Sequence, residues 1–160
     1  MGRCHSAAMK RPLLLAALLV PLLLSVAPSS PLAHDAGYYT LQARWIEQGG
    51  PWLAPLWFGA PVFDRSIGAQ WLMALSLRLF GATPGAEALP ALLAACSSLA
   101  LTGWLARRLL PRTTAERRLL PLLAVAVLAL TPLWLNYAHL ATQDMLLLAV
   151  ELAGISALVA

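Results

Sequence analysis

The apolar residues of this chain are gathered into separate runs, and this grouping restricts the fold more than any other feature. The runs read LLLAALLVPLLLSVA, ALPALLAACSSLALTGWLA, LLPLLAVAVLALTPLWL and MLLLAVELAGISALVA. Each has about the length of a helix that crosses a hydrocarbon core of ~30 Å. Charged residues make up only 11% of the 160 residues, against roughly 25% in soluble domains. The sequence therefore predicts an all-α, polytopic membrane protein with about four transmembrane helices.

The formal net charge of +4 does not indicate a nucleic-acid partner. The basic residues lie beside the apolar runs, where they set the orientation of membrane helices. Arg3, Lys10 and Arg11 flank the first run, and the basic tract ARRLLPRTTAERR lies between two later runs. The positive-inside rule places both groups in the cytoplasm. We therefore predict a multi-pass protein of the plasma (inner) membrane whose N-terminus is cytoplasmic.

Two cytoplasmic basic groups require an even number of crossings between them, yet three apolar segments intervene, at about 12–28, 67–80 and 88–106. The segment 67–80 is the shortest and contains Gln70 and Arg78. Because a charge near the bilayer centre costs several kcal/mol, this segment is the weakest span. Its apolar side chains recur at three-to-four spacing, at Trp71, Leu72, Leu75, Leu79 and Phe80. We predict an amphipathic helix that lies in the membrane interface.

A second short amphipathic pattern precedes this segment, in HDAGYYTLQARWIEQGG, residues 34–50. Its apolar side chains again recur at helical spacing, at Tyr38, Leu41, Trp45 and Ile46. The pattern stops at Gly49-Gly50, and glycine commonly ends a helix. We therefore predict two interfacial helices in the first outer region.

These predictions divide the chain into three parts. Residues 1–33 form the cytoplasmic N-terminus and first span, residues 34–87 the outer loop with the interfacial helices, and residues 88–160 three further spans. As an alternative, the N-terminus also fits a secretory signal, with the small residue Ala33 before a cleavage point. The sequence stops inside its last apolar run, so we expect a fragment of a longer polytopic protein.

Two acidic residues far apart in the sequence, Asp35 and Asp144, fall on the same outer face in this arrangement. Each also has a purely structural explanation. Asp35 begins a helical pattern and can act as an N-cap, and Asp144 in the first turn of a helix complements the helix dipole. The pair lies on the same face as Asp64-Arg65. Acids and a cation grouped at a membrane boundary suit general-base catalysis and the binding of phosphate or metal.

The segment DAGYYTLQARWIEQGGPWLAPLWFGAPVFDRSIGAQWLMALSLRLFG, followed by EALPALLAA and ATQDMLLLAV, resembles a known family. It is similar to the N-terminal part of the protein-mannosyltransferase and aminoarabinose-transferase-like membrane glycosyltransferases, the GT-C class. That family has a D-E-x-x-Y loop after the first span, a W-x-x-P element, a P-Y-F-D-K-P-P turn, a W-L-x-A-L-S-x-x-L-F-G helix and a later D-M-L-L. The resemblance covers about residues 34–150, and the order of the motifs carries it.

The resemblance implies roles for three residues. Asp35 matches the first-loop catalytic acid, which acts on the acceptor hydroxyl. Arg65 matches the basic residue that meets the lipid phosphate of the donor. Asp144 matches the acid of D-M-L-L, which lies near the same site. In some relatives this acid helps to hold a divalent metal, so Asp35 and Asp144 are implied as metal ligands.

The chain departs from the family pattern at three places. Ala36 replaces the usual Glu after the first-loop Asp, so a two-carboxylate first loop is in doubt. Ser66-Ile67 replaces the Pro-Pro pair, which loosens the turn that carries Arg65. Ala88 stands where an Arg is common before Leu-Pro.

The expected function is transfer of a hexose or pentose from a polyprenyl-phosphate-linked donor to a lipid, glycan or protein acceptor at the outer face of the membrane. The chain would be the N-terminal part of such an enzyme, and this part alone can be inactive. The alternative is a small non-catalytic membrane protein, such as a transporter subunit, or a degenerate remnant of the enzyme.

The orientation can be tested by cysteine labelling after the native Cys4 and Cys96 are replaced by serine. Single Thr114→Cys and Ser66→Cys variants are treated, in intact cells, with a membrane-impermeant thiol reagent. Only Ser66→Cys should react, because the basic tract around Thr114 is predicted to be cytoplasmic. Both variants should react after the cells are permeabilised. Labelling of Thr114→Cys in intact cells would invert the predicted orientation.

Overall fold

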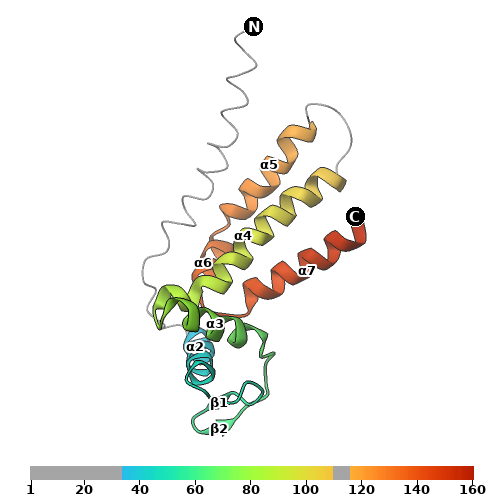
Figure 1. The fold of residues 1–160 in the computed structure, drawn as a ribbon. Coiled ribbons are helices and arrows are strands. Elements are labelled where there is room, and N and C mark those ends of the chain that lie inside the picture. Colours follow the sequence, from blue (N-terminus) through green and yellow to red (C-terminus); the bar gives the residue numbers. More distant parts are fainter. Residues whose placement is uncertain (1–33, 110–115) are drawn as a thin grey trace.

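A computed structural model describes residues 34–109 and 116–160 of the chain. The predicted first span, about residues 12–28, lies outside these residues. The elements, in chain order, are α2 (His34–Glu47), β1 (Leu56–Trp57), β2 (Ala60–Pro61), α3 (Gly68–Phe80), α4 (Pro84–Leu109), α5 (Glu116–Ala129), α6 (Pro132–His139) and α7 (Asp144–Val159). The described part of the chain is mostly helical. In Figure 1, α2, α3 and the two strands gather at the end where α4 begins.

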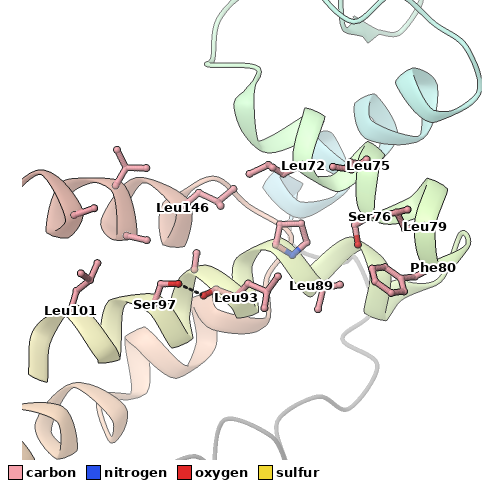
Figure 2. A pocket seen from close by; sticks show the side chains of 15 residues that line it. Leu72, Leu75, Ser76, Leu79, Phe80, Leu89, Leu93, Ser97, Leu101 and Leu146 are labelled. Atoms are coloured by element: carbon pink, nitrogen blue, oxygen red, sulfur yellow. Dashed lines mark hydrogen bonds between the residues drawn. The ribbon is translucent and has the colours of Figure 1, made fainter. Parts of the chain in front are cut away.

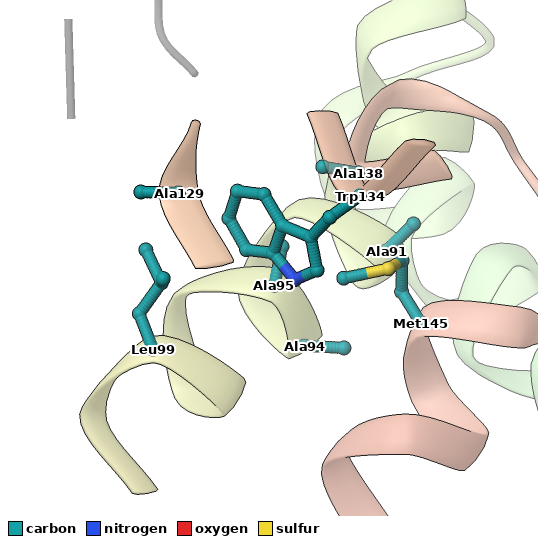
Figure 3. Close-up of a cluster of buried hydrophobic side chains, with 8 residues drawn as sticks. All are labelled: Ala91, Ala94, Ala95, Leu99, Ala129, Trp134, Ala138 and Met145. Carbon is teal, nitrogen blue, oxygen red and sulfur yellow. The ribbon is translucent and has the colours of Figure 1, made fainter. Parts of the chain in front are cut away.

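The long helix α4 is the scaffold of the structure, since it packs against α3, α5, α6 and α7. Its contact face is rich in alanine, which lets the neighbouring helices approach closely. The buried indole of Trp134 on α6 fills the space between them, and its Nε1 donates a hydrogen bond to Ser98 Oγ at 3.2 Å. Figure 3 shows the cluster, which consists of Ala91, Ala94, Ala95, Leu99, Ala129, Trp134, Ala138 and Met145.

Among the residues that the structure describes, α4 alone is long and apolar enough to cross a membrane by itself. Residues 119–129 of α5, taken together with α6, meet the same criterion, but the two helices are bent by 64° relative to each other. The last helix, α7, runs over 16 residues to Val159. The structure therefore confirms a helical protein with a candidate span but does not confirm four transmembrane helices.

The apolar run LLPLLAVAVLALTPLWL, about residues 119–135, is bent between α5 and α6, a feature that the prediction of a crossing here did not include. Thr131 has an extended backbone, with φ −71° and ψ 118°. A residue before proline is pushed away from the helical region by the proline ring, and Pro132 follows here. The chain therefore leaves α5 and starts α6 in a new direction.

The two predicted outer helices are both present, as α2 and α3. On α3 the apolar stripe is exposed as predicted, with Leu75, Leu79 and Phe80 on the surface, while Met73 and Leu77 on the other face are buried.

The predicted stripe of α2 is divided between two faces of the helix, which corrects that prediction. Tyr38 and Ile46 are buried, whereas Leu41 and Trp45 are exposed. The reason is that α2 packs against α3 and β1, so that part of its apolar surface is used inside the protein.

A short hairpin that the sequence analysis did not predict connects α2 to α3. Leu56 pairs with Pro61 and Trp57 with Ala60. The tip residues Phe58 and Gly59 both have positive φ, 51° and 83°, as in the tight turns that suit the twist of a hairpin. The ring of Trp57 lies 4.7 Å from that of Tyr38, which fixes the hairpin against α2.

Two arginines hold α2 in place. Arg44 Nε donates to Glu87 Oε1 at 2.6 Å, and the Glu87 side chain is only 7% exposed, so this ion pair joins α2 to the start of α4. Arg78 of α3 donates to the carbonyls of Ile46 and Glu47, which lie at the end of α2 and have no partner within the helix. The position of α2 is thus fixed at its middle and at its end.

The Arg44–Glu87 pair can be tested by Arg44→Met, which keeps the apolar stem and removes the charge. The variant leaves a nearly buried carboxylate without its partner, so we expect a loss of roughly 1–2 kcal/mol, moderated because water reaches the arginine. Arg44→Lys, which can still pair, serves as the control. Thermal unfolding in detergent measures both. Equal melting temperatures for Arg44→Met and the wild type would show that the pair adds nothing to stability.

Candidate functional site

Two of the residues predicted for the site are in direct contact. Asp35 lies in the first turn of α2, and Arg65 lies between β2 and α3. Arg65 Nη2 is 3.1 Å from Asp35 Oδ1, and Arg65 Nε is 3.9 Å from Asp64 Oδ2. The side chains of Asp35 and Arg65 are 56% and 35% exposed. The structure therefore places a carboxylate and a guanidinium side by side at an accessible surface.

Two tyrosines complete the surroundings of this guanidinium. Arg65 Nη1 donates to the hydroxyl of Tyr39 at 3.2 Å, and Tyr38 donates its hydroxyl proton to Asp64 Oδ1 at 2.6 Å. The Arg65 guanidinium carbon lies 5.3 Å and 5.4 Å from the centres of the two rings, within the range of cation–π attraction. Arg65 is thus held between two acids and two aromatic rings.

Neither tyrosine was predicted from the sequence as a site residue, since Tyr38 was assigned only to an apolar stripe. The spacing indicated that both tyrosines lie near Asp35, because residues three and four positions after it lie on the same face of a helix. What the sequence could not show is that the loop bearing Asp64 and Arg65 folds back over this face.

Both tyrosines keep their protons at neutral pH. Burial raises the pKa of Tyr38, and its hydrogen bond to Asp64 raises it further. Burial also raises the pKa of Tyr39, although the hydrogen bond from Arg65 opposes this effect. The hydrogen bond to Tyr39 in turn raises the pKa of Arg65 above its ordinary value. Arg65 is therefore a permanent cation, as an anion-binding group requires.

Asp144, the third predicted site residue, approaches from a different element. It is the first residue of α7 and lies in the first turn, after the N-cap residue Gln143. Its charge, like that of Asp35, helps to raise the pKa of Tyr39. Next to it, Ser66 Oγ donates to Gln143 Oε1 at 3.2 Å. Asp144 is thus related to the Asp35–Arg65 pair indirectly, by its electrostatic effect on Tyr39 and by the contact of its neighbour Gln143 with Ser66.

The predicted divalent metal has no complete ligand set in residues 34–109 and 116–160. No group of three or more His, Cys, Asp or Glu side chains there is placed to hold an ion. Asp35, one of the two predicted ligands, is paired with Arg65. The residues present therefore form an anion-binding arrangement more readily than a metal site.

An apolar groove, which we call the leucine groove, lies between α3, α4 and α7. It is formed by Leu72, Leu75, Ser76, Leu79 and Phe80 of α3, by Leu89, Pro90, Leu93, Ala94, Ser97 and Leu101 of α4, and by Leu146, Ala149, Val150 and Ala153 of α7. Figure 2 shows these side chains converging from the three helices.

A smaller hollow adjoins the leucine groove. It is lined by Ser66 and Gln143, and it shares Leu72, Leu146 and Val150 with the groove. Ser66 directly follows Arg65 in the chain. The hollow therefore extends from the groove to the residue next to Arg65.

A membrane-length helix with an arginine and acidic side chains gathered at one end is the arrangement of a membrane protein with a polar site at one membrane surface. The profile of the dolichyl-phosphate-mannose-protein mannosyltransferase family matches residues 64–160, more than half of the chain. The chain belongs to this family, which consists of membrane glycosyltransferases. No curated protein and no solved structure matches the chain.

The matched stretch includes Arg65 and Asp144, whereas Asp35 lies before its start. The family membership therefore covers the predicted phosphate-binding residue and one of the two predicted acids. Asp35 is connected with them through its ion pair with Arg65.

Proposed function

We propose that the chain forms the donor-binding part of a glycosyltransferase that transfers a sugar from a polyprenyl-phosphate-linked donor to an acceptor at the outer face of the membrane. The observation that carries the proposal is the Asp35–Arg65 pair, which is followed in the chain by Ser66, a lining residue of the hollow that adjoins the leucine groove. The acceptor is a hydroxyl of a lipid, a glycan or a protein, and the sugar is a hexose or a pentose.

The leucine groove supports an amphiphilic donor. Its walls are mostly apolar side chains from three helices, and the lining of the adjoining small hollow includes Ser66, the residue after Arg65. A long prenyl chain would bury apolar surface along such walls, while its phosphate reaches the permanently charged guanidinium. A free sugar phosphate would have no use for this groove.

The proposed reaction is a displacement at the anomeric carbon of the sugar. The acceptor oxygen forms the new bond to this carbon as the bond between the carbon and the phosphate oxygen breaks. The polyprenyl phosphate leaves with the electron pair, and Arg65 stabilises its charge. Asp35 takes the proton from the acceptor hydroxyl as general base. Asp144 is the second carboxylate proposed for the site.

The Asp35–Arg65 contact gives the donor a further role. A donor phosphate competes with the Asp35 carboxylate for the same guanidinium. When the phosphate binds, it displaces Asp35 from Arg65, and this carboxylate can then accept a proton from the acceptor. The base would thus become available when the donor is in place.

The role of Asp35 is tested by Asp35→Asn in the full-length protein. The amide keeps the shape and the capping ability but cannot take up a proton, so the rate of sugar transfer should fall by roughly 10²–10⁴-fold. Glu47→Gln, at the other end of α2, is the matched control and should transfer normally. Near-normal turnover by Asp35→Asn would show that Asp35 acts only as a helix cap and not as a base.

The role of Arg65 is tested by titrating a polyprenyl phosphate against the full-length protein in detergent. Arg65→Ala should weaken binding by about tenfold or more, because a charge-assisted contact is roughly twice as strong as a neutral hydrogen bond. Arg65→Lys keeps a point charge and should be milder. Arg107→Ala, at the opposite end of α4, is the control. Equal affinity in all four proteins would remove the phosphate role and favour a non-catalytic protein.

A further inference from the structure

A pair of buried amides lies directly behind the loop that carries Arg65. Gln42 of α2 and Gln70 of α3 are each only 1% exposed, and their side-chain amides meet at 2.8 Å. Buried polar groups of this kind cost desolvation free energy unless they are fully hydrogen-bonded. The contact between α2 and α3 is otherwise made largely by apolar side chains, so two glutamines here call for an explanation.

The hydrogen bonds fix the orientation of the Gln70 amide. When its nitrogen faces the start of α3, Nε2 donates to the carbonyls of Ser66 and Ile67, at 3.1 Å each. In the opposite orientation the Gln70 oxygen faces these two oxygens, and the Gln42 nitrogen is buried without a partner. When the Gln42 amide is turned as well, its Nε2 faces the Gln70 oxygen at 2.8 Å and can donate to it. Amide orientations are assigned in this way from the hydrogen-bond network.

The two carbonyls belong to the residues that follow Arg65 in the chain. Ile67 is the N-cap of α3, and no side-chain hydrogen bond caps this helix. Ser66 is held at two points, at its carbonyl by Gln70 and at its hydroxyl by Gln143. The backbone directly after Arg65 is therefore anchored from inside the protein, although it contains no proline.

We propose that Gln42 and Gln70 are positioning residues that hold the Ser66-Ile67 backbone, and through it the guanidinium of Arg65, in place for the phosphate of the donor. The inference rests on the proposed function. Gln70 binds the loop, and Gln42 keeps the Gln70 amide in the orientation that does so. Neither residue touches the donor.

A double substitution separates positioning from simple stability. Gln42→Met and Gln70→Met each leave the other amide buried without its partner, so each single variant should unfold at a lower temperature. The double variant removes both polar groups and keeps an unbranched side chain of similar length, so its melting temperature should return close to that of the wild type. Its affinity for a polyprenyl phosphate should nevertheless stay about three- to tenfold below the wild type.

The decisive measurement combines the double variant with Arg65→Ala. If the amides act through Arg65, the loss of affinity caused by Arg65→Ala should be clearly smaller in the double-variant background than in the wild type. The positioning role would be overturned if the Gln42/Gln70 double variant recovered wild-type affinity together with stability. It would also be overturned if the losses of affinity caused by the double substitution and by Arg65→Ala were strictly additive. If the wild type itself binds no polyprenyl phosphate, the proposed function fails first, and the inference falls with it.

Discussion

The guanidinium of Arg65 is the group on which the arrangement of the end where α4 begins depends. It contacts Asp35 and Tyr39 of α2 and the adjacent Asp64. A permanent cation at a half-exposed position needs such partners, because each of its donor groups is strongly polar and has a fixed direction. The loop between the hairpin and α3 is therefore drawn onto the first turn of α2. The same contact brings the predicted base and the predicted phosphate-binding group within one ion pair.

The helix α4 gives this cluster its surroundings. Its alanine-rich face admits Trp134, and its other side forms the leucine groove with α3 and α7. The stripe of α3 that the sequence suggested for the membrane interface contributes Leu72, Leu75 and Leu79 to one wall of this groove. An exposed apolar stripe serves lipid contact and ligand contact equally well, since both are driven by removal of apolar surface from water.

Much of the helical framework follows from the sequence alone. The periodicity of the apolar residues predicted α3, and the glycines after Glu47 predicted the end of α2, where Gly49 has φ 99°. The Thr131-Pro132 pair in the sequence is a signal for a bend, but the apolar residues on both sides of it favoured the prediction of one span. The family resemblance also identified the family correctly, from the order of short motifs rather than from any single one.

The site was predictable only in part, for a physical reason. The positive-inside rule placed Asp35, Arg65 and Asp144 at one surface, because it depends on charge counts that the sequence contains. The contacts of Tyr38 with Asp64 and of Gln42 with Gln70 depend on how two helices rotate against each other. Periodicity gave the wrong rotation for α2, since it assigned Tyr38 to a membrane-facing stripe. A short hairpin with only two residues in each strand leaves too little alternation to be recognised.

The exposure of the Asp35–Arg65 pair gives the site its chemical character. If the pair were buried, separating Asp35 from Arg65 would leave an uncompensated carboxylate in a medium of low polarity. The free-energy cost would then prevent a phosphate from displacing this carboxylate. At half exposure, water solvates the released carboxylate, so exchange of one anion for another on Arg65 is far easier. The buried partners, Tyr39 above all, keep the guanidinium in position. A fixed cation with an exchangeable acidic partner is therefore what the proposed donor binding and proton transfer at one site require.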